Sequence, residues 1–188
     1  NTQSTLTGDV ADLPRVTSSL YLYLYNTQSA LTGDVADLPR VTSTLDLRLY
    51  NTQSTLTGDV ADLPRVTSTL YLYLHNTQSV LTGDVADLPR VTGTLYLRLD
   101  GTQSVIGGGA TPVAIDRFDQ LQLHDMGLAQ TYVNDIIYRL YTDRASITAG
   151  TRNVTLGGTN DAPSATPHVD TYIPALIDAG FTISYKTP

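Results

Sequence analysis

Residues 26–50 read NTQSALTGDVADLPRVTSTLDLRLY, and this 25-residue unit decides the fold. The units begin at Asn1, Asn26, Asn51 and Asn76, with a degenerate fifth copy from Gly101. One such unit is too small to bury its own apolar face, whereas stacked units share a continuous core. The period therefore predicts a stack of equivalent units rather than a series of independent elements.

The end of each unit has the pattern of a strand. Leu20, Leu22 and Leu24 alternate with other residues, and the same alternation returns in every later unit. A period of two is typical of a strand whose successive side chains point to opposite faces. In-register stacking would place equivalent strands about 4.8 Å apart in a parallel sheet.

The start of each unit predicts turns. The segment Leu6–Gly8 contains a glycine that permits a backbone turn closed to other residues. The following DVADLPR, residues 9–15, suits a single 3₁₀ or α turn that Pro14 closes. Val10, Leu13 and Val16 are spaced to face the same interior as the strand leucines.

The string LxLxL, followed by an Asn-Thr turn, LTG and DLP, resembles a leucine-rich repeat. It is similar to the variety whose units carry an L-S-G-x-I-P-x-x-L turn. The resemblance covers residues 1–125 and implies an α/β solenoid with a parallel sheet on one face and short turns on the other. One departure is that Asn26 follows Leu24 by two residues, where the family asparagine follows by three. Thr27 has the family spacing, so either Asn26 or Thr27 could satisfy the inward backbone groups.

Two features of the chain depart from the regular repeat. In the fifth copy, Leu121 and Leu123 lie one residue later than the 25-residue period would place them, which predicts an insertion. Residues 126–188 lose the period and are expected to form a mixed α/β capping region. Its expected elements are a helix of about 17 residues from Leu128, a strand over 153–156, a helix over 171–179 and a strand over 181–185. The string LGGTNDAPS with AGFTISY resembles the end of leucine-rich-repeat-like proteins from bacteriophages and bacterial surfaces.

Variation between the units gathers at outward strand positions. The three variable columns, taken as a binding face, are Tyr21, Asp46, Tyr71 and Tyr96; Tyr23, Arg48, Tyr73 and Arg98; and Tyr25, Tyr50, His75 and Asp100. One interpretation is that these positions are merely tolerant and favour tyrosine for its strand propensity. Another is a recognition surface, since Tyr and Arg provide rigid contact area and directional hydrogen bonds. A third is that Arg48 stacks between Tyr23 and Tyr73.

The charges exclude some partners. The net charge is −7, which argues against nucleic acid and anionic membrane surfaces. No apolar run approaches the roughly 20 residues that cross a bilayer, so no membrane insertion is expected. Two aspartate columns would form a solvated edge that an arginine column offsets, in preference to a calcium ladder. These columns are Asp9, Asp34, Asp59 and Asp84; Asp12, Asp37, Asp62 and Asp87; and Arg15, Arg40, Arg65 and Arg90.

Motifs of catalysis are missing from the sequence. It contains no cysteine and no nucleophile, Walker or dinucleotide motif, and its three histidines lack metal-ligand spacing. No cofactor, metal or enzymatic activity is therefore expected. The leading hypothesis is an adhesion or structural element outside the cell, on a cell surface or a virion such as a bacteriophage tail or fibre. Its ligand would be a glycan or a protein.

Two further hypotheses remain from the sequence. One is a filament subunit that stacks end to end through an uncapped N-terminal repeat. The other is an accessory domain of an enzyme whose catalytic part lies elsewhere.

Overall fold

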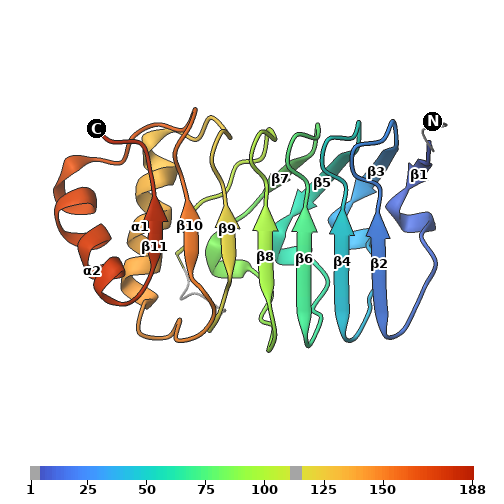
Figure 1. The fold of residues 1–188 in the computed structure, drawn as a ribbon, viewed down its shortest axis with the longest axis horizontal. Coiled ribbons are helices and arrows are strands. Elements are labelled where there is room, and N and C mark those ends of the chain that lie inside the picture. Colours follow the sequence, from blue (N-terminus) through green and yellow to red (C-terminus); the bar gives the residue numbers. More distant parts are fainter. Residues whose placement is uncertain (1–4, 111–115) are drawn as a thin grey trace.

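Two parallel sheets form the body of the protein in the computed structural model, which describes residues 5–110 and 116–188 (Figure 1). The larger sheet has the order β11-β10-β9-β8-β6-β4-β2, and the smaller has the order β1-β3-β5-β7. The larger sheet comprises β2 (Ser19–Tyr23), β4 (Thr44–Arg48), β6 (Thr69–Tyr73), β8 (Leu95–Arg98), β9 (Gln120–Gln122), β10 (Asn153–Thr155) and β11 (Thr182–Ser184). The smaller comprises β1 (Thr7–Asp9), β3 (Ala30–Asp34), β5 (Thr55–Asp59) and β7 (Val80–Thr82). Repeated parallel strands in stacked sheets are compatible with a solenoid-like repeat fold.

The strands of the larger sheet pair in the register that the sequence period predicts. Leu45 pairs with Leu20 on one side and with Leu70 on the other, so equivalent residues of neighbouring units lie side by side. Leu45, Leu47 and Leu49 are fully buried. Burying a leucine contributes about 1.5–3 kcal/mol, so each unit of three strand leucines stabilises its neighbours substantially. The predicted parallel sheet is confirmed.

The fifth unit is shorter than the regular units, not longer. Leu121 pairs with Leu97 and Tyr96 pairs with Gln120, so equivalent residues are 24 apart at this junction instead of 25. The predicted insertion was therefore wrong. A unit one residue longer than 25 and a unit one residue shorter would both leave Leu121 and Leu123 on the inward side of a strand. Only the pairing with β8 shows which of the two lengths is correct.

The segment predicted as a turn at the start of each unit is a strand of the second sheet. Thr32–Asp34 pairs with Thr55–Thr57 in parallel, and the same pairing joins the other units. An isolated bridge between Asp84 and Gly107 continues this pairing into the fifth unit. Buried backbone groups need partners, and the equivalent segment of the next unit supplies them. The NTQS turn of the first unit lies outside the described residues.

Short 3₁₀ turns follow the strands of the second sheet, as predicted. They span Val10–Asp12, Val35–Asp37, Val60–Asp62 and Val85–Asp87. In the first three, the aspartate before the turn accepts a hydrogen bond from the turn backbone, as Asp34 does from the N–H of Ala36 at 2.9 Å. The aspartate of the first column is thus an N-terminal cap in three of the four units, whereas the Asp84 side chain makes no cap hydrogen bond.

Buried threonine and serine hydroxyls join the units to one another. Thr52 donates to the carbonyl of Leu49 at 2.6 Å, and its oxygen accepts from the Ser54 hydroxyl at 2.9 Å. The Ser54 hydroxyl in turn accepts from the backbone N–H of Leu31, in the preceding unit. Equivalent bonds are made by Thr77 with Ser79 and by Thr102 with Ser104. The threonine therefore satisfies the inward backbone groups, which resolves the choice between Asn26 and Thr27.

The asparagine of each unit lies on the outside of the same turn. Asn26, Asn51 and Asn76 have φ near +55°, a conformation that asparagine tolerates better than most residues. Their side chains are linked by hydrogen bonds of 2.7 and 2.9 Å. Gly101 and Asp125 take the same left-handed conformation at the next two turns, so the stack continues past the last regular unit.

The C-terminal region adds two strands and the helices at the end of the stack (Figure 1). Helix α1 (Gln130–Asp143) buries its apolar face, and an irregular helical segment (Ala165–Tyr172) leads into α2 (Ile173–Asp178). The second helical region thus begins earlier than predicted, inside the expected loop. No helix of the described part of the chain is long and apolar enough to cross a membrane.

Candidate recognition face

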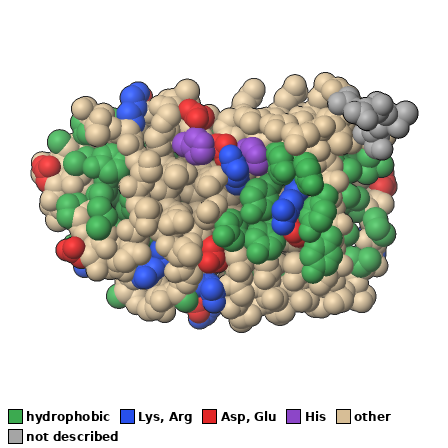
Figure 2. All heavy atoms as spheres, in the orientation of Figure 1, with side chains coloured by type: hydrophobic (Ala, Val, Ile, Leu, Met, Phe, Trp, Pro, Cys, Tyr) green, Lys and Arg blue, Asp and Glu red, His purple; other side chains and the backbone are tan. Residues whose placement is uncertain are grey.

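The twelve residues of the three variable columns lie on one face of the larger sheet, and we call this the tyrosine-rich face. Tyr21, Asp46, Tyr71 and Tyr96 are aligned across β2, β4, β6 and β8, and the second column is aligned beside them. The third column follows the same strands just beyond their ends, where backbone bonds still link the units. Figure 2 shows the resulting patch of apolar and aromatic side chains with arginines set into it.

Asp46 and Arg48 form a two-bonded ion pair within one strand. Arg48 donates from Nε and Nη2 to the two carboxylate oxygens of Asp46, both at 2.8 Å. The hydroxyl of Tyr23 also donates to Asp46 at 2.8 Å, and this bond raises the pKa of Tyr23. Asp46 is only 2% exposed, so it lies beneath Arg48 and Tyr23 and fixes their positions. It is not itself accessible to a ligand.

Arg48 lies among three tyrosine rings. Its guanidinium carbon is 4.9 Å from the ring centre of Tyr23, 5.2 Å from that of Tyr73 and 5.7 Å from that of Tyr71. The bonds to Asp46 raise the pKa of Arg48, so the cation stays in place. The structure thus shows the predicted stacking of Arg48 between Tyr23 and Tyr73. This stacking orders the rings and is compatible with a recognition surface.

The third column is a stack of rings. Tyr25 stacks on Tyr50 with centroids 4.8 Å apart, and Tyr50 stacks on His75 at 4.4 Å. His75 is only 6% exposed, and its Nδ1 is buried without a hydrogen-bond partner. Burial, and to a lesser degree the charge of Arg98, lowers the pKa of His75 to about 4. His75 therefore acts as a neutral ring in the stack.

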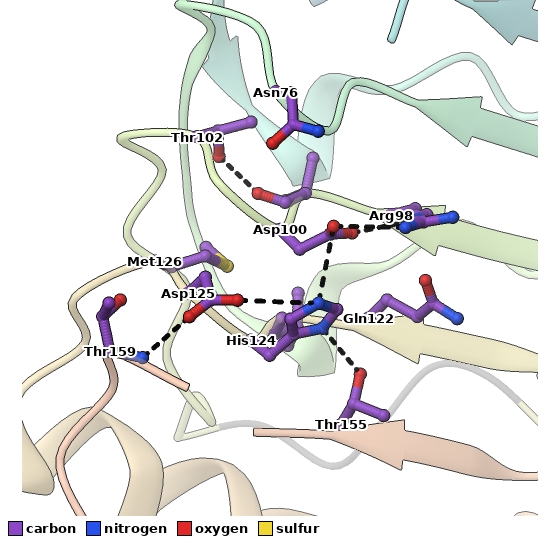
Figure 3. Close-up of polar contacts among 12 residues, drawn as sticks. Asn76, Arg98, Asp100, Thr102, Gln122, His124, Asp125, Met126, Thr155 and Thr159 are labelled. Carbon is purple, nitrogen blue, oxygen red and sulfur yellow. Dashed lines mark hydrogen bonds and ion pairs between the residues drawn. The ribbon is translucent and has the colours of Figure 1, made fainter. Parts of the chain in front are cut away.

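A second ion pair lies where the repeats meet the C-terminal region (Figure 3). Arg98 donates from Nε to Asp100 at 2.7 Å and from Nη2 at 3.3 Å. His124, from the turn that follows β9, approaches Asp100 at 3.5 Å and the hydroxyl of Thr155 at 3.3 Å. Asp100 is 6% exposed, so this carboxylate also serves mainly to hold Arg98 and His124.

The same face continues onto the C-terminal strands with amide and hydroxyl side chains, which the sequence analysis missed. Tyr96 pairs with Gln120, and Arg98 pairs with Gln122. The two columns then continue through Asn153 and Thr182, and through Thr155 and Ser184. The alternation of Gln120 and Gln122 around Leu121 was the available signal. In Figure 2 this part of the face lies beside the aromatic patch and is mostly uncharged.

A different set of hollows lies between successive 3₁₀ turns. Three hollows of about 390, 460 and 430 Å³ are lined by the DLPR segments of neighbouring units, with the arginine column at their rims. Within residues 5–110 and 116–188, the only ion pair of this column joins Arg90 to Asp116 at 2.6 Å. The arginine column was expected to offset the negative charge of the aspartate columns. In the part of the chain that the structure describes, it does not do so through ion pairs with those aspartates. No group of three or more possible metal ligands occurs among the described residues.

Comparison with protein-family models, characterised proteins and solved structures found no match to the chain. The function must therefore be argued from the geometry of the tyrosine-rich face and its continuation.

Replacing Asp46 by alanine is expected to lower the free energy of unfolding by about 2 kcal/mol, because Arg48 and Tyr23 lose a buried acceptor. The double variant Asp46→Tyr with Arg48→Tyr gives the second unit the strand sequence of the third, and it should stay within about 1 kcal/mol of the parent. Urea unfolding followed by circular dichroism measures both. Equal losses in the two variants would contradict the role given to the ion pair.

Acid should destabilise the protein through His75. The pKa of His75 is lower in the folded protein than its ordinary value of 6.5, so protons favour the unfolded chain. Stability is fully present above pH 6.5 and is lost as the pH falls toward 4, by at most about 3 kcal/mol at about 1.4 kcal/mol per pKa unit. His75→Tyr, the residue of the first two units, should remove this part of the pH dependence. If the parent and His75→Tyr give parallel curves of unfolding free energy between pH 7 and pH 4.5, His75 is not the source of the acid sensitivity.

Proposed function

We propose that the protein is a leucine-rich-repeat-like solenoid that recognises a ligand through its tyrosine-rich face, without catalysis. The supporting features are the 25-residue register, the LTG and DLP segments and the inward threonine of each unit. Residues 1–125 are the repeat region in this proposal, and residues 126–188 close its end.

One observation carries the proposed site: large aromatic side chains are exposed together on a surface that the fold makes rigid. Tyr21, Tyr23 and Tyr25 are 59%, 48% and 42% exposed. Exposed apolar and aromatic patches of this kind are typical of binding sites, and tyrosines lose little conformational entropy on binding. Arg48 and Asp46 hold the rings in place before a ligand arrives, which lowers the cost of association.

A protein with this surface, and with no nucleophile, Walker or dinucleotide motif in its sequence, fits an adhesion element. The place of action in this proposal is outside the cell, on a cell surface or a virion, where a rigid repeated surface can bind a glycan or a protein. The net charge of −7 is compatible with such ligands and opposes binding to nucleic acid.

The test is the capture of candidate ligands from a glycan array and from host-cell surface extracts. Tyr71→Ala combined with Tyr73→Ala should weaken binding about 30-fold, the effect of removing about 2 kcal/mol of contact energy. Thr57→Ala, on the exposed side of the second sheet, is the matched control and should bind like the parent. Because Arg48 packs on both tyrosines, Tyr21→Ala offers a milder variant with no expected loss of fold. Binding that both tyrosine variants leave intact would overturn the proposed face.

A second candidate is a filament subunit that associates through its first repeat. Leu6 is 43% exposed, whereas the equivalent Leu31 of the second unit is 1% exposed. Apolar side chains beside a free sheet edge favour pairing with another chain. Electron microscopy over a range of concentrations distinguishes the two candidates, because a filament lengthens with concentration and a monomeric binding module does not.

A further inference from the structure

From the continuation of the tyrosine-rich face onto the C-terminal strands, we infer that the ligand is an extended, uncharged polysaccharide that lies across the strands of the larger sheet. This inference rests on the proposed function and adds the chemical class of the ligand. It depends on four features: the neutralised charges, the paired amides, the aromatic rings and the continuity of the surface.

The charges of the face are already satisfied within the protein. Each of the arginines Arg48 and Arg98 makes two hydrogen bonds to an aspartate two residues away in its own unit. These pairs cancel in charge, and the aspartates Asp46 and Asp100 are buried. A ligand that carries its own charges would find no unpaired partner among these residues. The face therefore selects against polyanions and polycations.

The amides beside the aromatic patch present a donor and an acceptor together. Gln122 donates to the side-chain oxygen of Gln120 at 3.0 Å, in the same i to i+2 arrangement as the Arg48–Asp46 pair. This bond leaves the Gln120 amide group free to donate and the Gln122 oxygen free to accept. Sugar hydroxyls both donate and accept, so they match such a pair. Thr155, on the next strand, pairs with Gln122 and adds a hydroxyl group beside the two amides.

The aromatic half supplies the other chemistry that a sugar requires. Tyr71 and Tyr96 lie on adjacent strands with ring centroids 5.1 Å apart, and both residues are half-buried. Ring faces contact the apolar C–H faces of sugars, while the tyrosine hydroxyls provide hydrogen bonds at the rim. Burial and the nearby carboxylate of Asp119 raise the pKa of Tyr96, so its hydroxyl stays protonated and uncharged.

The two halves form one surface that matches a linear ligand. The columns that begin at Tyr21 and Tyr23 continue without a break in strand pairing to Thr182 and Ser184. Seven strands about 4.8 Å apart span about 29 Å, which is enough for several consecutive sugar rings. Tyr96 and Gln120 mark the junction, so a chain bound across it would contact both rings and amides.

The experiment measures retardation of the protein in gels that contain one polysaccharide each: mannan, laminarin and hydroxyethyl cellulose as neutral probes, and alginate and hyaluronan as anionic probes. A glycan array with neutral and anionic members widens the panel. We expect neutral binding that changes less than about twofold between 50 and 500 mM salt, because screening acts only on charges. Tyr96→Ala and Gln122→Ala should each weaken this binding about 10-fold, and Tyr96→Phe should retain most of it.

Thr57→Ala is again the control and should leave retardation unchanged. Binding restricted to the anionic probes, with a steep loss in salt, would overturn the inference. Capture of a host protein that depends on Tyr71 and Tyr73, together with no neutral glycan bound anywhere in the panel, would overturn the inference and leave the proposed face intact. Binding of neutral glycans that no variant of the face weakens would overturn both.

Discussion

Asn160→Ala is expected to lower the free energy of unfolding by about 4 kcal/mol, because one fully buried amide joins residues 123–128 to residues 156–160. Its oxygen accepts from the backbone N–H groups of Met126 and Leu128, at 3.1 and 3.0 Å. Its nitrogen donates to the carbonyls of Leu123 and Leu156, at 2.7 and 3.0 Å. Alanine would leave four buried backbone groups unsatisfied, and each costs on the order of 1 kcal/mol.

The neighbouring Thr159→Ala is the matched control. Thr159 is exposed and accepts one bond, from the N–H of Gly127 at 3.2 Å, so its loss should cost less than about 1 kcal/mol. Asn160→Asp separates the two roles of the amide, since a carboxylate can accept both bonds and donate neither. Guanidinium unfolding measures all three variants. If Asn160→Ala and Thr159→Ala differ by less than about 0.5 kcal/mol, the role of Asn160 as the link is refuted.

Gly58→Ala is expected to cost about 3 kcal/mol, although it adds one methyl group to a partly exposed strand. Gly58 has φ of +115°, a conformation that side chains rarely adopt. A Cβ atom there would overlap Oδ1 of Asp34. Asp34 caps the preceding 3₁₀ turn through the N–H of Ala36, so the methyl group would also displace a cap that contributes about 1 kcal/mol.

The first repeat provides the control for this prediction. Gly8 occupies the same position of its unit, but none of the residues that the structure describes places an atom within 4 Å of the position that its Cβ would take. Gly8→Ala should therefore cost about 1 kcal/mol, from the backbone alone. Adding Asp34→Ser to Gly58→Ala should recover part of the loss, since serine is a shorter residue that still caps. Equal costs at the two glycines, measured by thermal and urea unfolding, would show that contact between units plays no part.

The residues of the candidate face could be predicted from the sequence, but the burial and contacts of several of them could not. The comparison of units identified all twelve positions because the sequence varies at outward strand positions while the leucines stay constant. The burial of Asp46, His75 and Asp100 beneath their neighbours could not be read from the sequence, because alternation gives the side of a strand and not the depth of a side chain. The role of His124 was missed, because its contact with Asp100 depends on the register between β8 and β9.

The sequence by itself determined the repeat, the parallel strands of the larger sheet and the leucine core, because among the four regular units only an offset of 25 pairs equivalent leucines. Only the tertiary structure decided the rest. The second sheet arises from the Leu-Thr-Gly segments, which are too short to show a period and gain backbone partners only from the next unit. The shorter fifth unit and the extended face of amides and hydroxyls follow from pairing with β8. In each case the deciding hydrogen bonds join residues of different units, so they form only when the chain is stacked.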